Sequence, residues 1–238
     1  MKKKINKKKF NYIVIIPARM KSKRLPGKAL IKIKGIPMVI RTYLQCLKVV
    51  KKELIYVATD SKKIQDVCKN FGAKSILTSN KCLTGTDRVA EVAKKIKANL
   101  YVNVQGDEPL VNPNDIIKCI ELKKNNPTFV INGFTQIQSM EDFYSQNVPK
   151  VIIDKNNFLI YISRSPIPGF KSKEKNLYGL KRQVCIYGFN RNDLMFIKNN
   201  KNKEFLEERE DIEILRFIEN NRKVMMFECN SNSISVDI

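Results

Sequence analysis

Histidine and tryptophan are both absent from this chain of 238 residues. Without histidine there can be no Ser-His-Asp triad, no Cys-His pair, no HExxH zinc site and no imidazole general base. Any catalysis must therefore depend on carboxylates, amines, hydroxyls or a bound metal ion. Long apolar runs are lacking too, and none approaches the roughly 18 residues that a membrane-spanning helix needs. The sequence thus predicts no membrane span.

Paired or clustered cysteines are also missing. The six cysteines are scattered with no C-x-x-C, and no zinc-finger spacing is possible without histidine. Reduced, buried thiols are therefore favoured over disulfides or a metal site, which indicates the cytoplasm. The basic opening MKKKINKKKF is followed by an apolar segment that is too short for a signal peptide. We predict a disordered basic tail over residues 1–11 and a single domain over residues 12–238.

Acidic residues are scarce, with 23 of them against 45 lysines and arginines, a formal net charge of +22. Such a charge is typical of proteins that bind nucleic acid. The lysines, however, are spread along the whole chain among many asparagines and form no basic stripe with interleaved aromatic residues. A solvated basic surface is therefore favoured, and nucleic-acid binding is the alternative.

The first half of the chain alternates short β-branched runs with helical patterns. Strands are expected over 12–17, 54–58, 74–77 and 100–105. Helices are expected over 37–50, 61–70 and 86–96, and another begins after the capping residue Asn112. This alternation predicts a parallel sheet covered by helices.

The second half reads differently, with strands expected over 129–135, 148–154, 158–163 and 184–190 and a helix over 212–220. Because three of these strands follow one another with only turns between them, an antiparallel extension beside the parallel sheet is expected. The predicted fold class is therefore α/β, with a Rossmann-like mixed, mostly parallel sheet that carries this extension.

Three polar loops should meet at one edge of that sheet. In doubly wound sheets ligands bind outside the carboxyl ends of the strands, where loops 18–28, 59–60 and 106–109 would lie. Loop 18–28 carries five cations, among which Arg19 offers a fork of donors and Lys28 a point charge. Such a loop would suit a polyphosphate, although it is neither a Walker loop nor a GxGxxG. A plain basic surface loop is the alternative.

Acidic residues form two further candidate sites, the turn at 107–108 and the region 204–216. Asp107 and Glu108 directly follow an apolar strand that ends in Gly106, and carboxylates at a strand end hold Mg²⁺ well. The alternative is an acidic turn before a helix. In the acid-rich region 204–216, Glu210 and Glu213 are three apart and are expected to share a helical face. A solvated helix, in which nearby arginines 209 and 216 form ion pairs, is the ordinary explanation.

Two motifs of the sequence are highly specific: I-I-P-A-R-x-x-S-x-R-L-P-G-K over 15–28 and N-V-Q-G-D-E-P over 103–109. Further motifs are A-T-D over 58–60, G-T-D-R-V-A-E over 85–91, P-K-V over 149–151, S-R-S-P-I-P over 163–168, I-Y-G-F over 186–189, L-E-E-R-E-D-I-E-I-L-R over 206–216 and V-D over 236–237. Taken together, these motifs resemble those of the 3-deoxy-manno-octulosonate cytidylyltransferase (CMP-Kdo synthetase) family, whose fold is of the nucleotide-diphospho-sugar transferase type. The match runs in the family's order from about Tyr12 to Asp237.

The resemblance implies a nucleotidyltransferase that joins CTP to a 3-deoxy-2-ulosonic acid, most simply Kdo, for lipopolysaccharide assembly. The sugar's anomeric hydroxyl would attack the α-phosphorus and release pyrophosphate, with Mg²⁺ as the cofactor. The resemblance also implies a homodimer. Two alternatives remain open: the same reaction on an amino-substituted or nine-carbon ulosonate, and a catalytically impaired protein that binds nucleic acid.

The resemblance further assigns roles to individual residues. The residues expected to act in catalysis are Arg19, Lys28 and Asp107. The nucleotide would be bound by Ala18, Arg19, Ser22, Lys28, Thr86, Arg88 and Gln105. The sugar would be bound by Arg164, Gln183, Tyr187, Glu210 and Glu213. The metal ligands would be Asp107 and Asp237.

The chain departs from the family pattern in three places. Gln183 stands where the family usually has histidine, and Ile214 stands where it usually has glutamine. Both changes fall in the implied sugar pocket and none in the phosphate loop, so the resemblance specifies the reaction more closely than the ulosonate. Family members also continue past V-D with a short helix, whereas this chain stops at Ile238. Asp237 is therefore expected to lack the support of that helix, with the terminal carboxylate close enough to compete for the ion.

Overall fold

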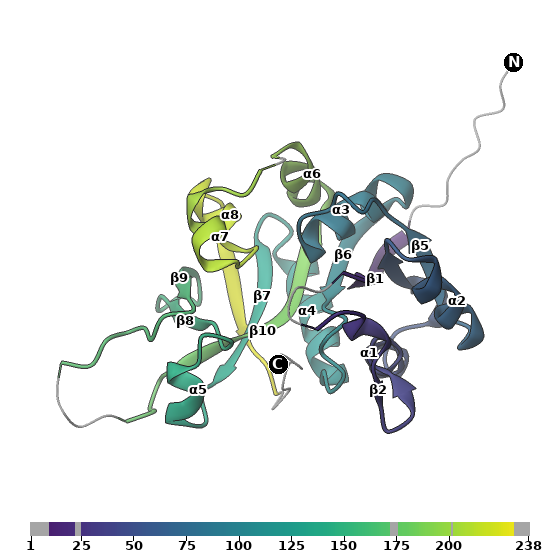
Figure 1. Ribbon diagram of the computed structural model, residues 1–238. Helices are drawn as coiled ribbons and strands as arrows, with labels where there is room; N and C mark the ends of the chain where they lie inside the picture. The colour runs from purple at the N-terminus through teal and green to yellow at the C-terminus, as the bar shows by residue number, and fades with distance from the viewer. Residues whose placement is uncertain (1–9, 22–24, 172–175, 201, 231–238) are drawn as a thin grey trace, which may run out of the picture.

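The structure, a computed structural model, describes residues 10–21, 25–171, 176–200 and 202–230 (Figure 1). Its strands are β1 (Phe10–Ala18), β2 (Lys32–Ile33), β3 (Ile36–Pro37), β4 (Ile55–Thr59), β5 (Lys74–Leu77), β6 (Ala98–Val104), β7 (Val130–Gln136), β8 (Lys150–Ile153), β9 (Leu159–Ser163), β10 (Lys181–Asn190) and β11 (Val224–Glu228). Its α-helices are α1 (Met38–Leu47), α2 (Lys62–Asn70), α3 (Gly85–Lys95), α4 (Pro113–Asn125), α5 (Met140–Tyr144), α6 (Arg191–Asn199), α7 (Phe205–Glu210) and α8 (Leu215–Glu219). Two short 3₁₀ turns, η1 (Lys28–Leu30) and η2 (Lys52–Leu54), complete the described elements.

One mixed sheet organises the molecule, with the strand order β11-β7-β10-β6-β1-β4-β5. Strands β6, β1, β4 and β5 are parallel, and β11 is parallel to β7. Strand β10 runs antiparallel between β6 and β7, and it also pairs with the β8–β9 hairpin. The predicted fold class, a mostly parallel sheet with an antiparallel extension, is therefore confirmed.

Both faces of the sheet are buried, which is why its strands read as nearly continuous apolar runs. On β1, Val14 and Ile16 pack with α1, α2 and α4 on one face. Ile13 and Ile15 pack with α3, α6 and α8 on the other. Among the described residues no helix is long and apolar enough to cross a bilayer.

The predicted elements of the first half are all present, with small shifts at their ends. Strand β1 begins at Phe10, so residues 10 and 11 belong to the sheet and not to the predicted tail, whose residues 1–9 lie outside the described ones. The prediction of one domain over 12–238 stays a prediction. Helix α6 was not predicted, although Asn190 and Asp193 form a capping box at its start. The short helix α5 was not predicted either, although Ser139 caps its start.

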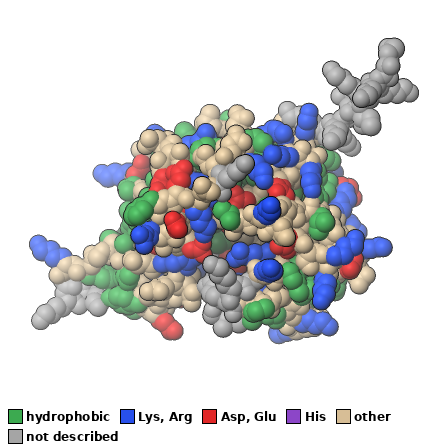
Figure 2. All heavy atoms as spheres, turned by 45° about the horizontal axis from the view of Figure 1, so that its top comes forward, with side chains coloured by type: hydrophobic (Ala, Val, Ile, Leu, Met, Phe, Trp, Pro, Cys, Tyr) green, Lys and Arg blue, Asp and Glu red, His purple; other side chains and the backbone are tan. Residues whose placement is uncertain are grey.

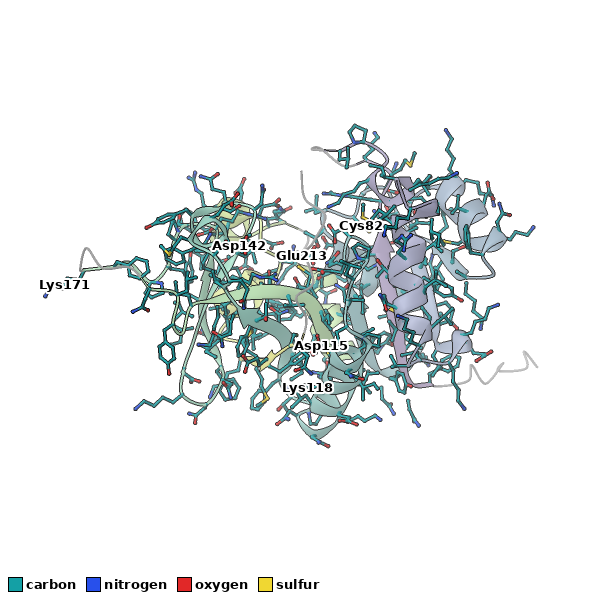
Figure 3. The ribbon with its side chains drawn as sticks, turned by 90° about the horizontal axis from the view of Figure 1, so that it is seen from below. Cys82, Asp115, Lys118, Asp142, Lys171 and Glu213 are labelled. Atoms are coloured by element: carbon teal, nitrogen blue, oxygen red, sulfur yellow. The ribbon has the colours of Figure 1, made fainter. Side chains whose placement is uncertain are left out.

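The second half adds an extension to the sheet. Residues after β9 reach away from the body of the molecule (Figure 1), and Lys171 lies at the far end of this reach (Figure 3). A small separate apolar cluster of Ile137, Phe143 and Leu180 supports its base. At the other end of the described chain, Asn230 donates its backbone N–H to Asp115 of α4 at 2.9 Å. The end of β11 is thus attached to the start of α4.

Gly106 lies where the turn after β6 passes the end of β1. A Cβ atom at this position would lie 2.7 Å from the backbone oxygen of Pro17. Thr42 of α1 donates its hydroxyl to the backbone oxygen of Gly106 at 3.1 Å, which fixes the turn from the other side. Only glycine therefore allows the two backbones to approach so closely.

We expect Gly106→Ala to lower the free energy of unfolding by about 1–3 kcal/mol, because two backbone segments must move apart to admit the methyl group. The matched control is Gly169→Ala, whose new methyl group would meet nothing within 4 Å. This control should change the free energy of unfolding by less than about 0.5 kcal/mol. Urea denaturation of the two variants measures both values, and equal effects would contradict the close approach as the cause.

Candidate active site

A cavity of about 440 Å³ opens where the carboxyl ends of β1 and β6 meet the first half of β10. Because β10 is antiparallel to β6, its Ile186 pairs with Val104, the last residue of β6. The cavity is lined by residues 17–19, 28–29, 83–85, 105–108, 147–149 and 211–213, together with Met38, Arg88, Arg164, Arg182, Gln183, Cys185 and Tyr187. Acidic and basic side chains lie close together around the middle of the face that Figure 2 shows.

The basic loop after β1 and the acidic turn after β6 meet, as predicted for loops at the carboxyl ends of parallel strands. Lys28 donates its Nζ atom to Asp107 Oδ2 at 2.8 Å. Both side chains are partly exposed, at 14% for Lys28 and 34% for Asp107, so a ligand can reach them. Arg19 lies exposed beside them in the same lining. Ser22, predicted for the same loop, lies outside the described residues.

The third predicted loop, 59–60, links the basic loop to α3 through hydrogen bonds. Asp60, after β4, accepts the backbone N–H of Met20 at 3.1 Å and the Nη2 atom of Arg88 at 3.1 Å. Arg88 is buried and donates as well to Thr78 Oγ1 at 2.5 Å. Its guanidinium therefore links the basic loop to α3, while part of the side chain lines the cavity where the nucleotide was predicted.

Gln105 lies directly against the start of α3. A Cβ atom at Gly85 would be 2.7 Å from Gln105 Nε2, so glycine at this helix start lets the amide lie in the cavity. The neighbouring Thr86, also predicted for the nucleotide, is buried and does not line the cavity. Of the predicted nucleotide-binding residues in the described chain, the cavity therefore includes Ala18, Arg19, Lys28, Arg88 and Gln105.

The prediction that Glu210 and Glu213 share a helical face is wrong. Helix α7 ends at Glu210, and Asp211 adopts a left-handed conformation with φ 50°, so the chain turns before α8 begins. Glu213 lies in this turn near the middle of the molecule (Figure 3), where it accepts the backbone N–H groups of Gly85 at 2.7 Å and Thr86 at 2.9 Å. The Thr86 hydroxyl donates to it as well. Burial raises the pKa of Glu213, and these donors oppose that rise.

The solvated helix with surface ion pairs is also wrong for this region. Arg216 and Glu207 are fully buried and joined by two hydrogen bonds, one of them from Nη2 to Oε1 at 2.7 Å. Arg216 also reaches Asp87 of α3 at 3.3 Å. Arg209 lies over the ring of Phe205 and pairs with no acid among the described residues. Buried ion pairs therefore join the acid-rich segment to the start of α3.

Arg164 joins three segments of the cavity wall. Its Nε atom donates to Glu210 O at 2.6 Å, its Nη1 to Gln146 O at 2.9 Å and its Nη2 to Asp211 O at 3.2 Å. Glu210 in turn accepts from the backbone N–H of Arg164 at 2.8 Å and from Ser163 Oγ at 2.6 Å. Arg164 lines the cavity, but Glu210 does not.

Lys150 lies beneath this wall and was not singled out from the sequence. Its fully buried ammonium donates to Ser145 O at 2.8 Å and to Arg164 O. Burial, helped by the nearby Arg164 guanidinium, lowers the pKa of Lys150 to about 8, while Glu210 acts in the opposite direction. In a chain with so many surface lysines, no sequence signal distinguishes this one.

The remaining predicted sugar-binding residues are on β10. Gln183 and Tyr187 both line the cavity and are both buried. Cys185 lies between them, and burial raises its pKa well above the ordinary value. A thiol held in its neutral form is a poor nucleophile, so the cavity does not favour covalent catalysis through this cysteine. All six cysteines are free thiols.

The described residues include no group of three or more acidic or cysteine side chains that could enclose a metal ion. Asp107 provides one hard carboxylate oxygen in the cavity, which fits Mg²⁺ held largely by water and phosphate oxygens. Asp237, the predicted second ligand, lies outside the described residues. Glu108, next to Asp107, is buried and also lines the cavity.

Comparison with known proteins gives consistent matches. The profile of a family described as cytidylyltransferase matches residues 13–224. The 3-deoxy-manno-octulosonate cytidylyltransferase of Trichlorobacter lovleyi is 38% identical over 235 residues, which cover 94% of this chain and 93% of that relative. The protein of the same name from Francisella tularensis is 39% identical over 224 residues, covering 90% of this chain and 88% of the relative.

Solved structures agree with these relatives. That of CMP:2-keto-3-deoxy-manno-octonic acid synthetase complexed with CTP has a TM-score of 0.83 and 32% identity, covering 94% of this chain and 92% of that chain. A putative glucose-1-phosphate thymidylyltransferase from Bacillus anthracis has a TM-score of 0.61 and 17% identity, covering 92% of this chain and 87% of that chain. This second likeness concerns the fold alone.

We expect Lys150→Met to reveal the lowered lysine pKa through stability. Because the pKa of Lys150 is about 8 in the folded chain and about 10.4 in the unfolded chain, the unfolded state binds more protons between these values. The wild type should therefore gain stability relative to the variant as pH rises through this window, by roughly 1–3 kcal/mol. Denaturation of both proteins at several pH values measures the difference.

The control for this measurement is Lys155→Met, which removes an exposed lysine in the turn after β8. The difference in free energy of unfolding between this control and the wild type should not change with pH over the same range. A flat difference for Lys150→Met as well would mean that the buried ammonium keeps its ordinary pKa.

Proposed function

The chain belongs to the 3-deoxy-manno-octulosonate cytidylyltransferase family, and we propose that it joins CTP to Kdo, giving CMP-Kdo and pyrophosphate. Identity of 38–39% to relatives of that name, over nearly the whole chain, supports the reaction. The observation that carries the proposal is the pairing of Lys28 with Asp107 in the lining of a cavity that Arg164, Gln183 and Tyr187 also line.

We assign the triphosphate to the side of the cavity formed by the basic loop. Arg19 can bind phosphate oxygens through a fork of donors, and Lys28 can do so as a point charge. Asp60 holds this loop near α3 through the Met20 N–H and Arg88, so the cations are positioned before the nucleotide arrives. Gln105, with its amide against the start of α3, is proposed to contact the cytosine ring.

We assign the ulosonic acid to the part of the lining that the second half of the chain contributes. The Arg164 guanidinium uses one hydrogen for each of three backbone oxygens and has five in all, so it can still donate to the sugar's carboxylate. The contacts of Glu210 and Glu213 support a different role from the predicted one, since both carboxylates already accept from protein groups. They are proposed to hold the wall in place instead of gripping sugar hydroxyls.

We assign the metal ion to the carboxylate of Asp107, on the side of the cavity proposed for the triphosphate. When bound, Mg²⁺ neutralises phosphate charge and lowers the pKa of the attacking hydroxyl. Asp107 is proposed as one ligand, which it can become by releasing Lys28 to the phosphates. Asp237 is proposed as the second ligand, as the family resemblance implies. The last described residue, Asn230, donates its backbone N–H to Asp115 of α4, the helix that follows Asp107.

Three further proposals concern the setting of the enzyme. Its product is proposed to feed lipopolysaccharide assembly, and six free thiols support a cytoplasmic location. A homodimer formed by the second-half strands is supported by the exposed apolar side chains of Ile160 and Tyr178, which are 56% and 95% exposed. On the face in Figure 2, basic side chains are interspersed with acidic ones.

We expect Asp107→Ala to lower kcat/KM for pyrophosphate release by at least about 100-fold, because the ion loses a ligand in the cavity. The apparent affinity for Mg²⁺ should weaken in the same variant. The matched control is Asp66→Ala, which removes an exposed carboxylate on α2. Release of pyrophosphate is measured with CTP, Mg²⁺ and a panel of 3-deoxy-ulosonates. If the wild type released no pyrophosphate with any of the sugars, the proposed reaction would be rejected. Normal pyrophosphate release by Asp107→Ala would reject the metal assignment.

Substitution of the two arginines should separate the two substrates. We expect Arg19→Ala to raise the KM for CTP about tenfold or more while the KM for the sugar changes little, because a charged hydrogen bond is lost on one side only. Arg164→Ala should do the reverse. Initial rates over a grid of both substrate concentrations give the two constants, and an unchanged sugar KM in Arg164→Ala would remove this residue from the sugar site.

A further inference from the structure

Gln183 meets a second buried amide at the cavity wall. Its Nε2 atom donates to Oδ1 of Asn132 at 2.9 Å. Asn132, on β7, is fully buried and donates its own Nδ2 atom to the backbone oxygens of Val184 at 3.0 Å and Ile186 at 2.9 Å. The register shift of β10 between Val184 and Tyr187 brings both oxygens within reach of one amide.

These contacts leave each amide only one orientation. A backbone carbonyl oxygen can only accept, so the end of Asn132 that faces Val184 and Ile186 must be its NH₂ group. Asn132 therefore turns its oxygen towards Gln183. Gln183 must present its NH₂ group to that oxygen, because turning either amide over would place acceptor against acceptor.

The oxygen of Gln183 is consequently left for the cavity. Gln183 lines the cavity and is 7% exposed. Within the described part of the chain nothing donates to its Oε1 atom, and this atom is not among the fully buried polar atoms without a partner. The side chain thus offers the cavity an acceptor at Oε1, beside the one Nε2 hydrogen that Asn132 does not use.

The neighbouring groups make an acceptor valuable at this place. Arg164 and Arg182, which line the same wall, can only donate. Glu213 accepts from the start of α3, and Glu210 accepts from Ser163 and from the backbone of Arg164. Guanidinium groups suit the carboxylate of an ulosonic acid, but the hydroxyl groups of that sugar also need an acceptor.

We infer that Gln183 determines sugar specificity in this chain, its Oε1 atom accepting a hydrogen bond from a hydroxyl or ammonium group of the acceptor sugar. This inference rests on the proposed function. An acceptor sugar with a proton donor at the matching carbon is favoured, and one with hydrogen or fluorine there is rejected, because neither can donate.

The test uses the wild-type chain with Kdo and a series of analogues in which one hydroxyl at a time is replaced by hydrogen, fluorine or an amino group. Pyrophosphate release with CTP and Mg²⁺ gives kcat/KM for each sugar. At one position we expect a loss of about tenfold or more with both hydrogen and fluorine, and less than about threefold with the amino group. Fluorine tolerated as well as hydroxyl at every position would overturn the inference.

A pair of variants ties the effect to this side chain. In Gln183→Met, the penalty for the hydrogen analogue should shrink to less than about threefold, since the acceptor has gone. In the control Gln138→Met, which changes an exposed residue outside the cavity lining, the full loss of kcat/KM with the hydrogen analogue should remain. If this loss of kcat/KM persisted in Gln183→Met, the inference would be overturned. The measurements with the analogues on the wild-type chain test the inference even if Gln183→Met folds poorly.

The outcomes also separate this inference from the proposed function. No release of pyrophosphate with any 3-deoxy-ulosonate would overturn both. Release with Kdo, but with no position that distinguishes a donor from fluorine, would overturn the role of Gln183 and leave the reaction standing.

Discussion

The reversal of strand β10 is the constraint on which the candidate site depends. Because β10 runs antiparallel between β6 and β7, its first residues lie beside the carboxyl ends of the parallel strands. Gln183 and Tyr187 therefore line the same cavity as Ala18 and Gln105. A parallel strand in this place would carry those two side chains to the opposite edge of the sheet. The direction of one strand thus unites the proposed phosphate side, built by the first half of the chain, with the proposed sugar side, built by the second.

Buried acids hold the proposed sugar side of the cavity in position although the chain is strongly basic. Glu207 pairs with Arg216, which also reaches Asp87, and Glu213 accepts the N–H groups that begin α3. Buried ion pairs add little net stability, because desolvation offsets their attraction. Their effect here is geometric: the segment between α7 and α8 cannot move without breaking its contacts with α3. The lining from Asp211 to Glu213 is therefore fixed relative to the start of α3.

Sequence reasoning predicted the sheet and the meeting of its loops because both follow from local patterns. Apolar runs mark strands that are buried on both faces, and parallel strands end at one edge. The prediction for 204–216 was wrong, because the spacing of Glu210 and Glu213 implies a shared face only if the helix is continuous. Asp211 interrupts it with a positive φ, and the partner of Arg216 on α3 lies 129 residues away in sequence. Lys150 could not be found either, since burial is a property of the fold and not of the lysine.

Groups outside the cavity lining decide which hydrogen-bond donors and acceptors the proposed sugar side presents. The shift in β10 aims two carbonyl oxygens at Asn132, these orient its amide, and that amide orients Gln183. The same logic applies to Arg164, whose three backbone acceptors determine how its remaining hydrogens are directed. Because hydrogen-bond direction is passed from fixed backbone groups to side chains, the identity of the lining residues alone does not determine what the cavity selects. A relative with the same lining residues but a regular β10 would offer the sugar a different set of donors and acceptors.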